Sequence, residues 1–207
     1  MTALLAAFLT VAALPYFMVT WRTALAALSL QGLLMAWMVL ERGPASSPEA
    51  LLSLVDLGLV RGLLAPIVLY RVLEAQRPPR RGDALLPNML SLATAAALVA
   101  LAFRFAGRLE PGGGEVQTAV AVSAAALLLA LLSLATQTGV FTQAVGALAA
   151  ENAIALFELG AEGGSTPLPV RLGAAVVFLL SVWLLSLYVR WLPPEAGPEP
   201  AGEGSAA

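Results

Sequence analysis

Long apolar stretches follow one another along almost the whole chain, separated by short polar breaks. Each stretch is about as long as the ~20 residues that a helix needs to cross a hydrocarbon core of about 30 Å. Of the 207 residues, 59% are hydrophobic and 12% are charged, and the charged share is about half that of a soluble domain. The pattern therefore predicts an all-α, polytopic integral membrane protein with about seven transmembrane helices. The predicted spans are 2–20, 23–40, 50–73, 84–106, 116–136, 139–159 and 169–192.

The order of the spans suggests a division of the chain. Residues 1–192 form the predicted transmembrane domain, in which 1–74 make a first three-helix unit, 84–106 a joining helix and 116–192 a second unit. The first stretch lacks a basic amino-terminal region and the next follows at once, which favours a retained helix over a signal peptide. After residue 192 the sequence PPEAGPEPAGEGSAA is acidic and of low complexity, so we expect 193–207 to be a disordered tail.

The distribution of arginine predicts how the chain is oriented. With seven spans, one side of the membrane receives Arg22, Arg71, Arg77, Arg80, Arg81 and Arg190. The opposite side receives Arg42, Arg104, Arg108 and Arg171. Cytoplasmic loops carry the excess of positive charge, so the first and denser set should face the cytoplasm. We expect the N-terminus outside and the acidic tail inside, in a bacterial cytoplasmic membrane.

Three residue types are missing from the sequence, and their absence limits its chemistry. The chain has no cysteine and no histidine, and all 11 of its basic residues are arginine. It therefore offers no thiolate, no imidazole ligand or general base, and no lysine for Schiff-base or proton-relay chemistry. We expect no catalytic residue, no bound cofactor and no metal site in this chain, and no nucleic-acid partner, because no basic face exists. Any redox reaction that it serves would take place in other subunits.

The span 139–159 carries the polar residues of greatest interest. Gln143, Glu151 and Glu158 are separated by eight and seven residues, which places them on one narrow stripe of an α-helix among small side chains. A carboxylate at membrane depth costs several kcal/mol unless it is paired, hydrated or protonated. Glu151, supported by Gln143 and the adjacent Asn152, is therefore the candidate proton- or charge-coupling group, with Glu158 as a second. The alternative is a carboxylate that only hydrogen-bonds a neighbouring helix and stabilises assembly.

A second set of charges lies in the span 50–73. Asp56 and Arg61 are five residues apart, about 140° around an α-helix, so a salt bridge within the helix is not favoured. We expect Arg61 to pair with another helix, either in this chain or in a neighbouring subunit. An arginine keeps its proton in proteins, so Arg61 can bias a nearby carboxylate but cannot relay protons itself. Structural pairing is the alternative role for Arg61.

The motif Gln143-x-x-Gly146-x-x-x-x-Glu151-Asn152-Ala153-Ile154 resembles that of the hydrogenase-4 component E family. These are membrane subunits of group 4 [NiFe]-hydrogenase and formate hydrogenlyase-type complexes. Their C-terminal part is similar to subunit K of respiratory complex I and to the small C subunit of Mrp antiporters, which would make 116–192 the subunit K-like unit. The seven-span pattern and Gln31-Gly32 also fit, whereas the family pattern has a lysine where Arg61 stands.

The resemblance implies a non-catalytic subunit of a complex I-related redox complex that couples electron transfer to proton or sodium-ion translocation through Glu151. Its partners would be antiporter-like subunits and membrane subunits of the quinone-site or hydrogenase type, with the cofactors held by other chains. Two other interpretations stay open. The chain could be a structural spacer in the same membrane arm, or an independent small secondary transporter. Against the second, the sequence has no clear inverted repeat and few polar groups that would converge on a substrate.

Overall fold

The computed structural model of the protein describes residues 1–17, 20–43, 47–76, 89–109, 114–137, 139–161 and 167–191. Within these ranges the ordered elements are all helices, so the protein is an all-α polytopic membrane protein, as the sequence predicts. The helices are α1 (Thr2–Phe17), α2 (Trp21–Arg42), α3 (Pro48–Leu54), the π-helix η1 (Val55–Leu64), α4 (Ala65–Gln76), α5 (Met89–Leu109), α6 (Glu115–Thr136), α7 (Val140–Ala161) and α8 (Leu168–Trp191).

Six of the predicted spans are long and apolar enough to cross a membrane. The segments α3, η1 and α4 follow one another without a break and together form one of them, Pro48–Ala75. The seventh predicted span, 2–20, is represented by the 16-residue α1, which at 1.5 Å per residue is about 24 Å long. The start of the predicted span 84–106, the arginines Arg77, Arg80 and Arg81, and the acidic tail 193–207 lie outside the described residues.

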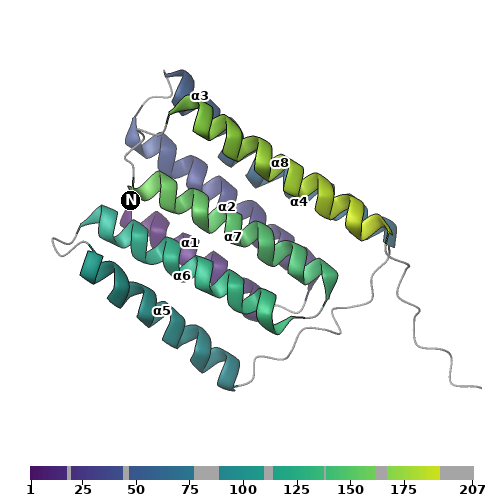
Figure 1. Ribbon diagram of the computed structural model, residues 1–207, viewed down its shortest axis with the longest axis horizontal. Helices are drawn as coiled ribbons and strands as arrows, with labels where there is room; N and C mark the ends of the chain where they lie inside the picture. Colours follow the sequence, from purple (N-terminus) through teal and green to yellow (C-terminus); the bar gives the residue numbers. More distant parts are fainter. Residues whose placement is uncertain are drawn as a thin grey trace, which may run out of the picture.

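The helices are arranged in two layers. Figure 1 shows α5, α6, α7 and α8 side by side in one layer, with α1, α2 and the α3–α4 span behind them. In the contacts between the layers, α1 packs against α6, α2 against α7, and α4 against α8, whereas α5 packs against α6 at the edge. The first, second and third spans thus lie against the fifth, sixth and seventh, and the fourth stands outside the two rows.

Each of these cross-layer pairs is parallel. Leu5 near the start of α1 shares a core cluster with Ala119 near the start of α6. Likewise, an Arg171 guanidinium nitrogen near the start of α8 donates to the Ser53 hydroxyl near the start of the α3–α4 span, at 2.6 Å. An even number of helix reversals separates the two members of each pair, because α5 lies between the two rows in the sequence. The joining helix is thus what allows the second row to repeat the direction of the first.

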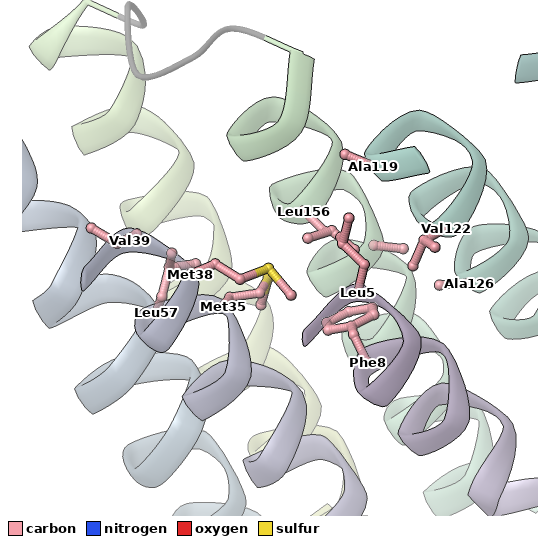
Figure 2. Packing of buried hydrophobic residues seen from close by; sticks show 11 residues of the cluster. Leu5, Phe8, Met35, Met38, Val39, Leu57, Ala119, Val122, Ala126 and Leu156 are labelled. Atoms are coloured by element: carbon pink, nitrogen blue, oxygen red, sulfur yellow. The ribbon is translucent and has the colours of Figure 1, made fainter. Parts of the chain in front are cut away.

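Small and flexible apolar side chains fill the space where four helices meet. Figure 2 shows Leu5 and Phe8 of α1 directed toward Met35 of α2 and Leu156 of α7, and all four side chains are buried. Alanines on α6 complete this cluster, and they allow that helix to come close to its neighbours. By contrast, only 11% of the most apolar window of α5 is buried inside the chain, so most of this helix is open to lipid or to a partner.

The closest approach between two helices occurs where α2 crosses η1. A Cβ atom added to Gly32 would lie 2.5 Å from the backbone nitrogen of Gly62 and 2.6 Å from its Cα atom. Gly62 itself packs against Leu33 of α2. The absence of side chains at both glycines therefore sets the separation of these helices, and it brings the backbone of α2 next to the residue that precedes Gly62, Arg61.

Candidate functional site: a polar cluster at the centre of the bundle

A chain of hydrogen bonds joins three helices near their midpoints. The Arg61 guanidinium of η1 donates from Nη1 to the Asn152 Oδ1 atom of α7 at 3.3 Å. Asn152 in turn donates from Nδ2 to the Gln31 Oε1 atom of α2 at 3.2 Å. All three side chains are buried, and each residue stands close to the middle of its membrane-length helix. The cluster therefore lies at the depth where unpaired polar groups are most costly.

The fourth member of the cluster, Asp56, corrects one expectation from the sequence. The Asp56 Oδ2 atom accepts a hydrogen bond from Arg61 Nε at 3.1 Å, so the salt bridge within the helix does form. The reason is that residues 55–64 are a π-helix, in which hydrogen bonds join residues five apart. Residues at this spacing lie one above the other in a π-helix, whereas in an α-helix they point in different directions. The backbone thus brings together two charges that α-helical geometry would separate.

The proline that follows the π-helix supplies a local reason for this geometry. Pro66 has no backbone N–H, so it cannot donate to the carbonyl of Gly62 one turn earlier. The Ser29 hydroxyl of α2 donates to that carbonyl instead. At the end of the π segment the Ala65 N–H bonds to the Val60 carbonyl, five residues back. A serine on the neighbouring helix therefore satisfies a backbone group that the proline leaves without its helical donor.

Arg61 is buried among the described residues. Its side chain is 4% exposed, and its guanidinium carbon lies 4.1 Å from the centroid of the Phe178 ring on α8. Arginine is the cation best suited to such a position, because its planar group can stack on a ring while its nitrogens donate in the plane. The expectation that Arg61 finds a partner on another helix is confirmed, and that partner, Asn152, belongs to this chain.

A polar crevice leads from Asp56 toward the end of the bundle where α3 begins. It has a volume of about 50 Å³ and lies between the α3–η1 span, α7 and α8. Its polar lining residues are Ser53, Asp56, Arg61, Glu158 and Arg171. Glu158, predicted from the sequence as a second coupling residue, is half-buried in this crevice. Two acids and two arginines thus share one narrow space.

Glu151 lies apart from this cluster, although it is next to Asn152 in the sequence. It is half-buried, on a stripe of α7 that also carries the exposed residues Gln143, Ile154 and Phe157. Within the described part of the chain, the Glu151 carboxylate forms no hydrogen bond or ion pair. The predicted polar stripe is thus divided: Gln143 is exposed, Glu151 is half-buried, and Glu158 lies in the crevice that it shares with Asp56 and Arg61.

Sequence reasoning missed two members of the cluster and one residue at its edge. Gln31 entered only through the family resemblance, although a lone glutamine within an apolar span is itself a sign of a buried partner. Phe178 gave no such sign, because aromatic residues are common in apolar spans. Arg171 counted only toward orientation, yet it bonds Ser53 and the Glu49 carbonyl across two helices. Only the packing of α8 against the α3–α4 span reveals these two roles.

The arrangement can hold a fixed charge and orient water, but among the described residues no group of three or more acidic side chains could bind a metal ion. No protein-family model, no curated protein and no solved structure matches this chain. What it does is therefore inferred from the residues at its centre and from Glu151 on α7.

Proposed function

We propose that the protein is a non-catalytic membrane subunit of a complex I-related redox complex of the membrane-bound hydrogenase type. In that complex it would couple electron transfer in other subunits to the translocation of protons or sodium ions. Glu151 carries the proposal: it stands half-buried near the middle of a membrane-length helix, and the described residues give its carboxylate no partner. The resemblance of the motif around Glu151 to the hydrogenase-4 component E family supports the same function.

The position of Glu151 favours a partner subunit over a chain that works alone. A carboxylate facing hydrocarbon is costly, and it either takes up a proton or finds a donor on a neighbouring protein. The nearby stripe residues Gln143, Ile154 and Phe157 present one amide among apolar groups, a surface suited to another membrane helix. A partner helix that carries a cation or a hydrogen-bond donor at this depth would complete the environment of Glu151.

The buried cluster has a different task in this scheme. Arg61 keeps its proton, so it acts as a fixed charge that Asp56 partly neutralises. Asn152 links Arg61 to the turn of α7 that also holds Glu151. A redox event in a neighbouring subunit could change the charge of Glu151 or the group that it bonds. That change would then alter the electrostatic environment of Arg61, one helical turn away. The chain itself would break no bond and hold no cofactor.

Replacing Glu151 with glutamine tests this function directly. We expect the complex to assemble and to oxidise its donor, while the number of ions moved per electron falls by about an order of magnitude or more, because an amide cannot carry the proton. The measurement is dye-monitored ion uptake in inverted membrane vesicles, normalised to electron transfer. Glu74→Gln, at an exposed position near the end of α4, is the matched control and should behave as the wild type.

Two outcomes of the Glu151→Gln experiment would overturn the coupling role. Normal ion transport per electron would mean that Glu151 only stabilises assembly, and it would support the interpretation of the chain as a structural spacer. The same conclusion would follow if most of the complex failed to assemble while the assembled remainder moved the normal number of ions per electron. Glu151 would then serve assembly and not coupling.

The partners are tested by mild-detergent purification of the tagged chain. We expect antiporter-like membrane subunits and a metal-bearing hydrophilic arm to co-purify, because the Glu151 carboxylate has no partner among the described residues and would find one on a neighbouring protein. Recovery of the chain alone, as a stable monomer or homo-oligomer, would contradict the proposal. In that case ion flux through liposomes that contain only the purified chain would identify an independent transporter.

A further inference from the structure

We infer that the crevice between the α3–η1 span, α7 and α8 is a water-filled path that is open to one side of the membrane and ends at the Asp56–Arg61 pair. Its ligand is water, and through water the protons of that side reach the centre of the bundle. This inference rests on the proposed function for the use made of those protons. The access of water is a property of this chain and can be tested without any partner.

The first observation is an unsatisfied oxygen at the inner end of the crevice. Asp56 Oδ2 accepts from Arg61, but the buried Oδ1 atom of the same carboxylate has no hydrogen-bond donor among the described residues. A carboxylate oxygen can accept two hydrogen bonds, and leaving a buried acceptor without any is unfavourable. The crevice that Asp56 lines has a volume of about 50 Å³, which exceeds the room that a single water molecule needs. Water in the crevice supplies the missing donor.

The lining of the crevice is suited to water over a metal cation. Among the described residues, the charged side chains that line the crevice with Asp56 are Arg61 on its own helix, Glu158 from α7 and Arg171 from α8. Their formal charges balance, so the crevice offers a cation no net electrostatic attraction. Water can donate to the carboxylates and accept from the arginines, so it complements both kinds of group.

The crevice is closed at its inner end by side chains that already bond one another. The guanidinium of Arg61 lies on the ring of Phe178, and beyond it Asn152 bonds Gln31. On the far side of Gln31 is a separate cavity of about 20 Å³, whose polar lining includes Ser133 and Thr142. The Gln31–Asn152–Arg61 contacts therefore separate two spaces, and water that enters beside Asp56 stops at Arg61.

The outer end of the crevice is polar and leads to the end of the bundle where α3 and α8 begin. There an Arg171 guanidinium nitrogen donates to the Ser53 hydroxyl at 2.6 Å and to the Glu49 carbonyl at 3.3 Å. Polar groups therefore continue from Asp56 to Glu49, which is exposed. With the orientation expected from the arginines, this is the outer side of the membrane.

Thiol labelling tests the inference, because the natural chain has no cysteine and gives no background. Single variants Ser53→Cys, Ala155→Cys and Ala174→Cys place a thiol on three helices that line the crevice, and they leave Asp56 and Arg61 intact. Sealed vesicles of both orientations are treated with a membrane-impermeant methanethiosulfonate reagent. Only a thiol in contact with water ionises and reacts, so a thiol that faces lipid should be inert.

Control variants show from which side of the membrane the reagent reaches a thiol, and how slowly a thiol in lipid is labelled. Glu49→Cys and Glu74→Cys mark the two ends of the bundle, and Val177→Cys on the exposed face of α8 marks the lipid. We expect the crevice variants to be labelled from the side that labels Glu49→Cys and not from the side that labels Glu74→Cys. Their labelling should be about tenfold or more faster than that of Val177→Cys, because the thiolate is the reacting form.

Each outcome bears on the inference separately from the proposed function. Labelling of the crevice variants from both sides, or from neither while Glu49→Cys reacts, would overturn the one-sided path. Three variants on different elements guard against the loss of one through misfolding. One-sided labelling in a chain that co-purifies with no partner would keep the water path and remove the proposed coupling function.

Discussion

Replacing Arg61 with methionine is expected to lower the free energy of unfolding by about 3–5 kcal/mol, the range found when one partner of a buried ion pair is removed. The variant leaves the Asp56 carboxylate without its cation, at a site where its other oxygen already has no protein donor. It also removes the hydrogen bond to Asn152 and the stacking contact with Phe178. The measurement is unfolding in mixed micelles of increasing SDS content, followed by tryptophan fluorescence.

A second substitution separates the cost of an unpaired charge from the loss of packing. In the double variant Asp56→Leu, Arg61→Met both charges are gone, and replacement of a whole buried pair by apolar groups is often close to neutral. We therefore expect the double variant to be more stable than Arg61→Met alone. Arg190→Met, an exposed residue in the last turn of α8, is the control for the loss of one arginine and should change little. A double variant less stable than the single would contradict the ion-pair explanation.

Lysine at position 61 should give an intermediate loss of stability. A lysine keeps the charge, but its single ammonium group cannot bond Asp56 and Asn152 in the plane of a group that also stacks on Phe178. Full stability of Arg61→Lys would instead mean that only the charge matters. The sequence alone does not distinguish full stability from a loss of stability. The two hydrogen bonds of Arg61 and its contact with the Phe178 ring favour a loss of stability.

Replacing Gly32 with alanine is expected to cost about 1–3 kcal/mol, the usual penalty for overpacking a close contact. The added Cβ would lie 2.5 Å from the Gly62 nitrogen and 2.8 Å from the Arg61 carbonyl carbon. These are backbone atoms and cannot rotate away, so α2 must separate from η1. That movement would also disturb the Ser29 bond to the Gly62 carbonyl and the position of Gln31. The same SDS unfolding measurement applies.

The matched control for Gly32 is another glycine within a helix. A Cβ added to Gly173 in α8 meets no atom within 4 Å. Gly173→Ala should therefore be neutral or more stable than wild type by up to about 1 kcal/mol, because alanine is the better helix former. Equal effects of the two substitutions would show that the contact between α2 and η1 is not tight. Under the proposed function, Gly32→Ala should also lower coupling, since Gln31 and Arg61 flank the contact.

Much of the fold could be read from the sequence because burial in lipid leaves few alternatives. A span of about 20 apolar residues has to satisfy its own backbone, and only a helix does so within one segment. For this reason the helical class and most helix bounds follow from the polar breaks between the apolar stretches. The first span is the exception, since α1 ends at Phe17 and is shorter than predicted.

The candidate site could be read only in part. The sequence identified Asp56, Arg61, Asn152, Glu151 and Glu158 as polar residues at membrane depth, because each interrupts an apolar run. It gave the wrong relation between Asp56 and Arg61, since an angle of about 140° applies to an α-helix and residues 55–64 form a π-helix. The structure adds that Glu151 is half-buried and that its carboxylate has no hydrogen bond or ion pair among the described residues.

The sequence by itself determined that this chain is helical, that it lies in a membrane, and which of its side chains are costly there. These properties depend on the local hydrophobicity of each segment, which does not change with the neighbours it packs against. Only the tertiary structure decided which costly groups meet: Gln31, Arg61 and Asn152 come from three helices, and Phe178 from a fourth. Those contacts depend on the rotation and separation of helices, which are set by the glycines between α2 and η1 and by the hydrogen-bond register of one π-helix.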